Sequence, residues 1–260
     1  MQLPIFQVDA FASETFKGNP AAVVPLDEWL PDHVMQSIAM ENNLSETAFF
    51  VPTQVGFEIR WFTPLAEVNL CGHATLATAH VIFNEAKFNS NEVQFGSRSG
   101  ILTVKKEADK LKLDFPADSF TEVELSQEII NAVGETPVKA FKGKTDYLLI
   151  YKNEDAISKI NPNFHLLKKA EARGVCVSAP GNEVDFVSRF FAPSVGINED
   201  PVTGSAHTTL TPFWSNELEK TKLTALQLSQ RGGELEVELQ NDRVSISGKA
   251  VTYLQGEIFV

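Results

Sequence analysis

The chain has 260 residues, 43% of them hydrophobic, with 19 Phe and a formal net charge of −12. This composition can bury one large core or two smaller ones, and the ordinary content of charged residues argues against a disordered chain. The negative charge disfavours nucleic acid and anionic membrane surfaces as partners, because both repel an acidic protein.

The N-terminal sequence and the cysteines set further limits. The first residues, MQLPIFQVDAF, contain no basic leader with a cleavage site, and no apolar run approaches the roughly 20 residues that span a bilayer. We therefore expect a cytoplasmic protein. Cys71 and Cys176 are far apart, and the histidines show no paired-ligand spacing beyond His73 and His80. A structural metal and a disulfide framework are not expected.

The first predicted elements are an amphipathic helix over 31–42 and a strand that begins near Glu46. Side chains alternate between the two faces of a strand, so Glu46 would share a face with Leu44, Ala48 and Phe50. This places an acid on the more apolar face. Two interpretations stay open: a carboxylate at the strand end that reaches water, or a functional acid.

An internal repeat organises the chain. FEIRWFTP (57–64) aligns without a gap with FVSRFFAP (186–193), GHATLATAH with GSAHTTLTP, and GILTVKKEADKLKL with GELEVELQNDRVSI. The three matches occur in the same order at nearly the same offset. They indicate two similar halves of about 130 residues each.

The sequence of each half predicts the same order of secondary-structure elements. These are an amphipathic helix, a strand, the Arg-Phe-Pro strand, a loop, an apolar helix that begins with Gly, and a hairpin. The amphipathic helix of the second half is predicted over 163–172. The helices that start at Gly72 and Gly204 are apolar around most of their circumference, so we expect both to be buried. The expected domains are 1–118 and 119–260, with the chain end allowed to cross back to the first half.

The two loop–helix junctions are candidate binding sites. A small residue in the first turn leaves backbone N–H groups open, and these groups together with the helix dipole attract anions. Gly72 with His73, and Gly204 with Ser205, are therefore candidate anion sites. Close packing at the glycines and capping by Ser205 would explain each junction as well. Two such helix ends that face one cleft would favour a carboxylate ligand.

Other polar residues near the junctions admit two interpretations. Asp200 precedes a proline, and an acid in such a loop is either a turn former or a group held in one defined pose. His73 is either a core histidine or a functional one, and His207 is assigned to a second layer around the site or to the surface. Arg60 and Arg189 occupy equivalent positions of the repeat, which indicates a shared structural role such as binding the loops.

Together these motifs resemble a known family. NLSET around Glu46, CGHAT around His73 and EDPVTGSA around Asp200 are similar to the signatures of the PhzF-like phenazine-biosynthesis isomerase family. The resemblance runs over the full length, from DAF…GNPAAVV to GKAVTYLQGEI. It implies an α+β fold of the diaminopimelate epimerase type, with two homologous domains, each a mixed β-barrel wrapped around a central helix, and an active site between them. It also implies a homodimer.

The same resemblance implies roles for individual residues. Glu46 matches the catalytic acid/base, His73 and Asp200 match its polar partners, and Gly72 and Ser205 match residues that bind substrate at the helix starts. The implied reaction is a cofactor-free and metal-free proton shift on a small carboxylate, as in the isomerisation of dihydro-3-hydroxyanthranilate. Such a reaction needs one carboxyl group that both accepts and donates a proton.

The sequence departs from the epimerase branch of this fold, whose members place one cysteine at each junction. Cys71 occupies the first of these positions, but Thr203 occupies the second. Racemisation by two thiols is therefore disfavoured. Two alternatives remain: an epimerase or racemase that uses Glu46 and Cys71 as unlike bases, and a non-catalytic protein that binds small carboxylates. These residues do not define the physiological substrate.

Overall fold

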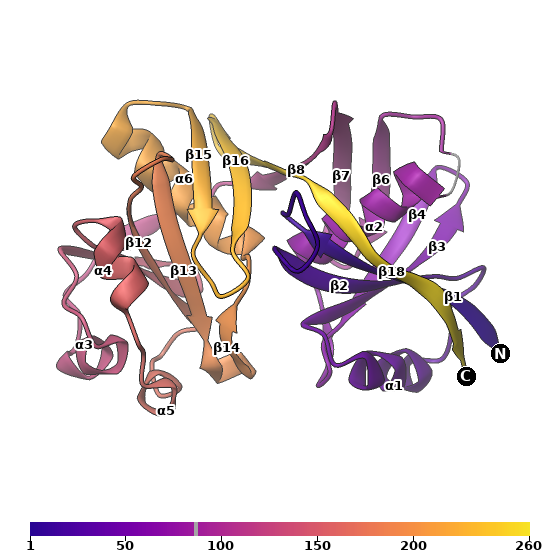
Figure 1. Ribbon diagram of the computed structural model, residues 1–260, viewed down its shortest axis with the longest axis horizontal. Helices are drawn as coiled ribbons and strands as arrows, with labels where there is room; N and C mark the ends of the chain where they lie inside the picture. The colour runs from indigo at the N-terminus through magenta and orange to yellow at the C-terminus, as the bar shows by residue number, and fades with distance from the viewer. Residues whose placement is uncertain (86–87) are drawn as a thin grey trace. The chain divides into compact units, whose positions relative to one another are not determined.

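Both ends of the chain lie in the same part of the structure. Strand β18 (Ala250–Phe259) pairs antiparallel with β1 (Gln2–Ala10), as Figure 1 shows for the yellow and indigo strands. The computed structural model describes residues 1–85 and 88–260. It divides into two compact units: Met1–Asp114 with Ser247–Val260, and Phe115–Ile246. The expected first boundary, at 118, falls a few residues later than this division.

The first unit holds a mixed sheet and two longer helices. In chain order its elements are β1, β2 (Asn19–Pro25), α1 (Asp32–Asn42), β3 (Glu46–Thr53), β4 (Gly56–Phe62), β5 (Glu67–Val68), α2 (Gly72–Glu85), β6 (Glu92–Ser97), β7 (Gly100–Glu107), β8 (Lys110–Pro116) and β18. Strand β8 crosses the boundary of the unit, which falls after Asp114.

The second unit has the same mixture of elements. They are β9 (Phe120–Glu122), α3 (Gln127–Val133), β10 (Lys139–Gly143), β11 (Asp146–Ile150), α4 (Glu154–Lys159), α5 (Phe164–Leu167), β12 (Gly174–Pro180), β13 (Phe186–Ala192), the 3-10 turn Pro193–Val195, β14 (Ile197–Asp200), α6 (Gly204–Leu218), β15 (Lys222–Gln227), β16 (Gly233–Gln240) and β17 (Arg243–Gly248).

The pairing of the strands repeats between the units, which confirms the internal repeat. In the first unit, β2 and β3 are parallel, β3 and β4 antiparallel, β4 and β6 parallel, and β6 and β7 antiparallel. In the second unit, β11 and β12 are parallel, β12 and β13 antiparallel, β13 and β15 parallel, and β15 and β16 antiparallel. Each half of the sequence therefore builds the same mixed sheet.

The apolar helices α2 and α6 are buried as predicted. Leu76, Ala77 and Ile82 of α2 and Leu210 of α6 have no exposed surface. Helix α2 packs on β1, β2, β3 and β18, and α6 packs on β11, β15 and β16. Each helix therefore forms part of the hydrophobic core of its own unit, and its first turn is held by that packing.

A proline inside α6 has a specific compensation. Pro212 has no N–H group, so the carbonyl oxygen one turn earlier, on Thr208, loses its helical partner. The backbone N–H of Asp118 donates to that oxygen at 3.0 Å. The helix can therefore continue to Leu218 without leaving a backbone carbonyl unpaired.

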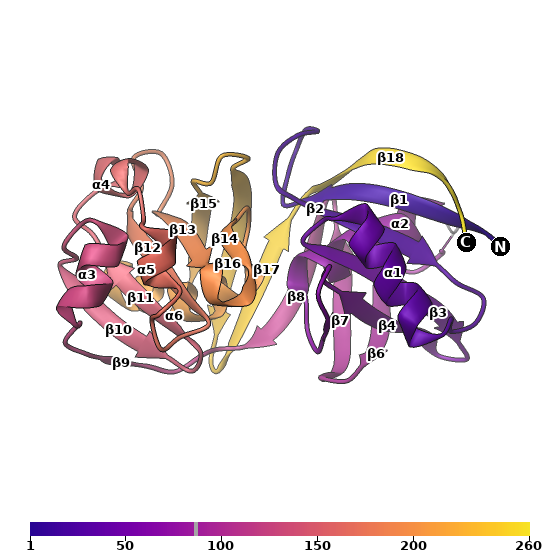
Figure 2. The same ribbon diagram turned by 90° about the horizontal axis from the view of Figure 1, so that it is seen from below.

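Of the two predicted amphipathic helices, one matches the structure and the other is shorter than predicted. Helix α1 matches the predicted 31–42 closely and lies against β3 and β4 (Figure 2). It ends at Asn42, and the capping residue Asn43 adopts a left-handed conformation with φ 50°. The helix expected over 163–172 is too long, since α5 ends at Leu167. The residues after Leu167 are mostly charged and exposed, so no apolar face holds a further turn against the unit.

Among the described residues, no helix has the length and the apolar character needed to cross a membrane.

Candidate active site

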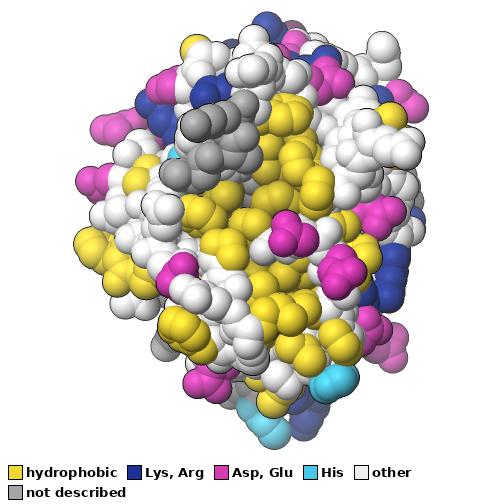
Figure 3. Space-filling model, turned by 90° about the vertical axis from the view of Figure 1, so that its right-hand side faces the viewer, with side chains coloured by type: hydrophobic (Ala, Val, Ile, Leu, Met, Phe, Trp, Pro, Cys, Tyr) yellow, Lys and Arg dark blue, Asp and Glu magenta, His cyan; other side chains and the backbone are white. Residues whose placement is uncertain are grey.

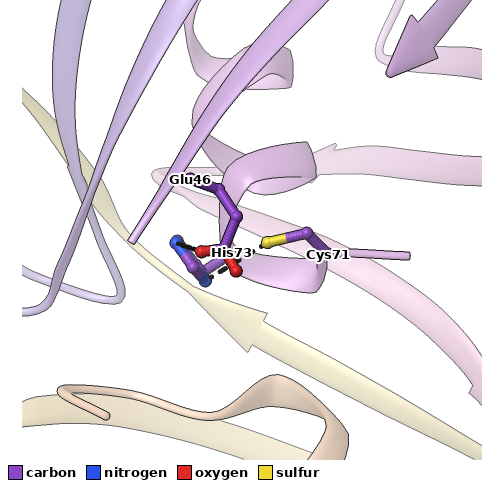
Figure 4. Close-up of side chains that lie close together, drawn as sticks. All are labelled: Glu46, Cys71 and His73. Carbon is purple, nitrogen blue, oxygen red and sulfur yellow. Dashed lines mark hydrogen bonds and ion pairs between the residues drawn. The ribbon is translucent and has the colours of Figure 1, made fainter. Parts of the chain in front are cut away.

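Glu46 and His73 form the centre of the candidate site. Glu46 is the first residue of β3, and His73 lies in the first turn of α2. Oε2 of Glu46 and Nε2 of His73 are 3.2 Å apart, with side chains that are 13% and 7% exposed (Figure 4). Both faces of β3 are buried, so Glu46 does not lie on the apolar side of a half-exposed strand. Its carboxylate is at the strand end, but it faces His73 and little water.

The opposite ring nitrogen of His73 has two partners. Nδ1 lies 3.3 Å from the side-chain nitrogen of Asn19 and 3.5 Å from the sulfur of Cys71. The Asn19 amide donates, so Nδ1 accepts and the ring hydrogen lies on Nε2, toward Glu46. Burial lowers the pKa of His73 to about 3, which keeps the ring neutral near pH 7. His73 is therefore neither an isolated core histidine nor a cation.

The contact between Glu46 and His73 is close but not aligned. The two atoms are within ion-pair distance, yet the geometry does not meet the criteria of a hydrogen bond. Catalytic hydrogen bonds are often poorly aligned before substrate binds, and a small side-chain rotation would align this one.

Cys71 completes the group. Its side chain is buried, and it directly precedes α2. Glu46, Cys71 and His73 each offer one ligand atom. These three atoms lie within 4.8 Å of one another, so the group could also hold a metal ion. The spacing of cysteines and histidines along the sequence did not reveal this group, because Glu46 reaches it from another element.

Asp200 in the second unit is part of a network of hydrogen bonds. Its Oδ2 accepts a hydrogen bond from the Thr203 hydroxyl at 2.5 Å, and its backbone carbonyl accepts one from the Gln227 side chain at 2.7 Å. The side-chain oxygen Oε1 of Gln227 accepts a hydrogen bond from the backbone N–H of Thr203 at 2.9 Å. Gln227 is 1% exposed. It ties the loop that carries Asp200 to the end of β15, a role that sequence reasoning missed.

Ser205 is exposed in the first turn of α6 and does not cap this helix, which has Thr203 at its N-cap position. The Arg173 guanidinium donates to the Ser205 hydroxyl at 3.0 Å and also pairs with Asp146. The α6 start therefore carries the Arg173–Asp146 ion pair beside its first turn. No sequence pattern pointed to Arg173, because the repeat has no matching arginine in the first half.

The surface assignment of His207 is wrong. Its side chain has no exposed surface, and Nδ1 donates to the carbonyl oxygen of Thr203 at 2.8 Å. Burial lowers the pKa of His207 to about 4, so the ring is neutral near pH 7. His207 lies behind the Asp200 loop as a buried structural residue.

Arg60 and Arg189 have the shared structural role that the repeat predicts. Arg60 binds both carboxylate oxygens of Glu67, at 2.7 and 2.8 Å, and Arg189 binds both carboxylate oxygens of Glu199, at 2.7 and 2.9 Å. Glu67 and Glu199 lie on the short strands β5 and β14, which lead to the two buried helices. Each arginine thus holds the segment that precedes a candidate site.

The structure brings some of the predicted residues together and leaves others separate. Glu46, Gly72 and His73 meet in the first unit, and Asp200, Gly204 and Ser205 lie on the same loop and helix start of the second unit. Each unit thus presents its own group of polar side chains at the first turn of a buried helix.

Comparison with known proteins identifies the family of this chain. Residues 8–256 match the family described as phenazine biosynthesis-like protein. Two uncharacterized isomerases of Pseudomonas aeruginosa are 49% and 52% identical over 99% of both chains. The crystal structure of a PhzF-family protein from Enterococcus faecalis is 47% identical, covers all of both chains and superposes with a TM-score of 0.98.

More distant structures share the fold. A hydroxyproline epimerase from Agrobacterium vitis superposes with a TM-score of 0.63 over 99% of this chain and 92% of the other, at 10% identity. The fold is thus of the epimerase-like class with a mixed sheet. Because the family match covers nearly the whole chain and the similar proteins include isomerases, this protein is an isomerase and belongs to the phenazine biosynthesis-like family.

Proposed function

We propose that the protein is a cofactor-independent isomerase that moves a carbon-bound proton on a small carboxylate, with Glu46 as the general acid/base. The observation that carries the proposal is the position of Glu46: its side chain is 13% exposed, and Oε2 lies 3.2 Å from Nε2 of His73. A carboxylate that has lost most of its water and lies beside a fixed polar side chain is well placed to take a proton and return it.

The proposed reaction uses one carboxyl group twice. Glu46 removes a proton from a carbon next to a double bond, and the electron pair of the C–H bond enters the conjugated system. The protonated Glu46 then returns the proton to another carbon of that system on the same face. His73 carries its hydrogen on Nε2 and stabilises the ionised form of Glu46 at the end of the cycle.

Binding of the substrate is assigned to the helix starts. We propose that backbone N–H groups at Gly72 and Gly204 and the hydroxyl of Ser205 bind carboxylate oxygens. The Ser205 hydroxyl oxygen accepts from Arg173, so its hydrogen can donate to a carboxylate oxygen of the substrate. Asp200, held by Thr203 and Gln227, is proposed to orient the substrate.

An epimerase that uses Glu46 and Cys71 as two bases is the alternative. Bases on opposite faces of one carbon must each approach it to about 3–3.5 Å, which places them roughly 6–7 Å apart. The ligand atoms of Glu46 and Cys71 lie within 4.8 Å of each other, a spacing that favours one base. Replacing Cys71 by Ser separates the two functions, since a thiol base predicts nearly complete loss of activity and a single acid predicts a modest change.

Incubation in deuterated water tests the function directly. The full chain is incubated with cyclic and acyclic unsaturated carboxylates, and mass spectrometry and NMR follow deuterium uptake and isomer formation. We expect at least one carboxylate to isomerise, and Glu46→Gln to abolish the reaction. Glu41→Gln, a change of an exposed acid on α1, is the matched control. Isomerisation by Glu46→Gln at the original rate would contradict the proposal, and tight binding without exchange would favour a non-catalytic protein.

We also propose that the protein forms a homodimer. The face in Figure 3 presents a broad run of hydrophobic side chains with few charged groups among them, as protein–protein interfaces commonly do. Exposed hydrophobic residues at the paired chain ends, Met1, Phe259 and Val260, offer further apolar surface. Light scattering coupled to gel filtration should give twice the monomer mass of 28.7 kDa. A monomer at micromolar concentration would exclude a stable dimer.

A further inference from the structure

The group of Glu46, Cys71 and His73 offers three different metal-binding atoms. A carboxylate oxygen, a thiol sulfur and a ring nitrogen lie within 4.8 Å of one another. Cys71 is 7% exposed and His73 is 6% exposed. Among the side chains that the structure describes, in residues 1–84 and 88–260, this is the one group of at least three such residues that meets the distance requirement.

These donors match the preferences of Zn²⁺ better than those of Mg²⁺ or Ca²⁺. Thiolate and imidazole are strong ligands for Zn²⁺, whereas Mg²⁺ and Ca²⁺ prefer oxygen ligands only. Zinc sites with three protein ligands keep a fourth position for water. The chain's many surface carboxylates cannot reproduce this combination, because they lack the sulfur and nitrogen.

The spacing needs only side-chain movement. Zinc–ligand bonds of about 2.0–2.3 Å in a tetrahedron place neighbouring ligand atoms roughly 3.3–3.8 Å apart. Glu46 Oε2 and His73 Nε2 are already 3.2 Å apart, the Cys71 sulfur is 3.5 Å from His73 Nδ1, and one ligand atom of each residue lies within 4.8 Å of the others. Coordination through Nε2 moves the ring hydrogen to Nδ1, where the side-chain oxygen of Asn19 can accept it once the amide turns over. His73 is in the first turn of α2 and Cys71 directly precedes it, so a rotation of the Cys71 side chain can bring the sulfur closer without moving the helix.

We propose that Glu46, Cys71 and His73 form a site that binds one Zn²⁺ and that this ion reversibly inhibits the enzyme. Binding itself depends only on the three ligands. Inhibition rests on the proposed function, since a carboxylate that coordinates Zn²⁺ cannot serve as the base that takes a proton from substrate. Cells that expose the protein to free Zn²⁺ would then switch the isomerase off without changing its fold.

Direct binding is measured without reference to activity. The full chain is freed of metal with a chelator, dialysed, and titrated with ZnCl₂ in a calorimeter in the presence of excess Mg²⁺, which occupies surface carboxylates. We expect one equivalent of Zn²⁺ to bind. Cys71→Ser should weaken binding at least about tenfold, the lower limit for perturbing a metal site. Glu46→Gln provides a second ligand change that leaves the thiol in place.

Cys176 supplies the matched control. It is the other cysteine of the chain, is also buried, and lies on β12 of the second unit. Cys176→Ser should bind Zn²⁺ like the unmodified chain. Replacing Zn²⁺ by Co²⁺ should give the near-ultraviolet absorption of a thiolate–cobalt bond in the unmodified chain and in Cys176→Ser, but not in Cys71→Ser. Absence of stoichiometric binding, or equal affinity in Cys71→Ser, would overturn the site.

The inhibition is tested separately on a substrate found by the exchange experiment. Activity should fall as one equivalent of Zn²⁺ is added and return when chelator is added. The Zn²⁺ concentration that halves the rate should rise at least about tenfold in Cys71→Ser, measured against the metal-free rate of that variant. Stoichiometric binding with unchanged activity would keep the metal site and refute both the inhibition and the assigned role of Glu46.

Discussion

His73 Nε2 lies 3.2 Å from Glu46 Oε2. Strand β2, which contains neither residue, contacts both of them. Glu46 is paired with Ala21 in the parallel ladder between β2 and β3. Asn19, the first residue of β2, holds Nδ1 of His73 at 3.3 Å. The start of β2 therefore sets the position of the carboxylate through the backbone and the orientation of the ring through a side chain. Such support from rigid elements keeps a catalytic pair in one geometry.

Glu46→Gln tests the importance of this carboxylate for turnover. Glutamine keeps the size of the side chain but cannot accept and return a proton, so the isomerisation rate should fall at least about a hundredfold, the lower end for a general acid/base. The fold should survive, because a neutral amide is easier to bury than a carboxylate. Steady-state kinetics and thermal unfolding measure the two effects. An unchanged rate would return Glu46 to the role of an acid at a strand end.

The internal repeat made much of the fold predictable. A match without gaps keeps each residue on the same strand face in both halves, so the equivalence of Arg60 and Arg189 led directly to two equivalent ion pairs. The buried helices also followed from local composition, because their apolar residues leave no polar face for solvent. Glu46, His73 and Asp200 were singled out by their motifs, and the structure places His73 beside Glu46.

Other features depend on contacts that no local pattern records. Asn19 meets His73 only because β2 pairs with β3, and Gln227 meets Asp200 only because β15 lies beside β13. The helix predicted over 163–172 is too long for the same reason, because a local pattern does not show how far a helix packs against the rest of its unit. Its residues have ordinary helix propensity, but helices in proteins are held mainly by packing, and only Leu167 of α5 is fully buried.

Arg60→Lys tests the structural role of the bidentate pair. Lysine keeps the charge but cannot bind both oxygens of Glu67 in parallel. We expect the free energy of unfolding to fall by about 1–3 kcal/mol, because the pair is largely buried and each bond to a charged group contributes in this range. Urea unfolding measures the change. Arg98→Lys is the control, since Arg98 contacts the same Glu67 from an exposed position and should cost less than about 1 kcal/mol.

If Arg60 instead bound substrate, Arg60→Lys would raise KM and leave the unfolding curve unchanged. The structural assignment therefore fails on that combination of results.

Stability should decrease in mild acid because of the buried histidines. Burial lowers the pKa of His207 to about 4, whereas an unfolded chain has a pKa near 6.5. Between these values the unfolded chain binds a proton that the folded protein does not, so acidification in this range favours unfolding. His73 and His80, whose pKa values burial lowers to about 3 and about 4, act in the same direction.

His207→Asn isolates one of these contributions. Asparagine can still donate to the carbonyl oxygen of Thr203 but does not titrate, so the loss of unfolding free energy between pH 7 and pH 5 should shrink by about 2 kcal/mol. Urea unfolding at both pH values gives this difference, which does not depend on any constant destabilisation by the substitution. His165→Asn, a change of an exposed histidine on α5, controls for the loss of an imidazole. If the free energy of unfolding falls equally in His207→Asn and in the unmodified chain between pH 7 and pH 5, the contribution assigned to His207 is wrong.

Asp200→Asn should distinguish orientation from proton transfer. Asparagine keeps the size of the side chain and still accepts from the Thr203 hydroxyl, while Gln227 holds the backbone of the loop, so the local structure should persist. If Asp200 orients substrate, the rate should fall about tenfold, less than the hundredfold minimum for a group that transfers the proton. Deuterium uptake and isomer formation should then slow in parallel, because both follow the step that Glu46 performs.

Asp242→Asn, a change of an exposed acid at the β16–β17 turn, should leave the kinetics unchanged. A loss in Asp200→Asn as large as that in Glu46→Gln would instead make Asp200 a second proton-transfer group, and the one-carboxyl mechanism would be wrong.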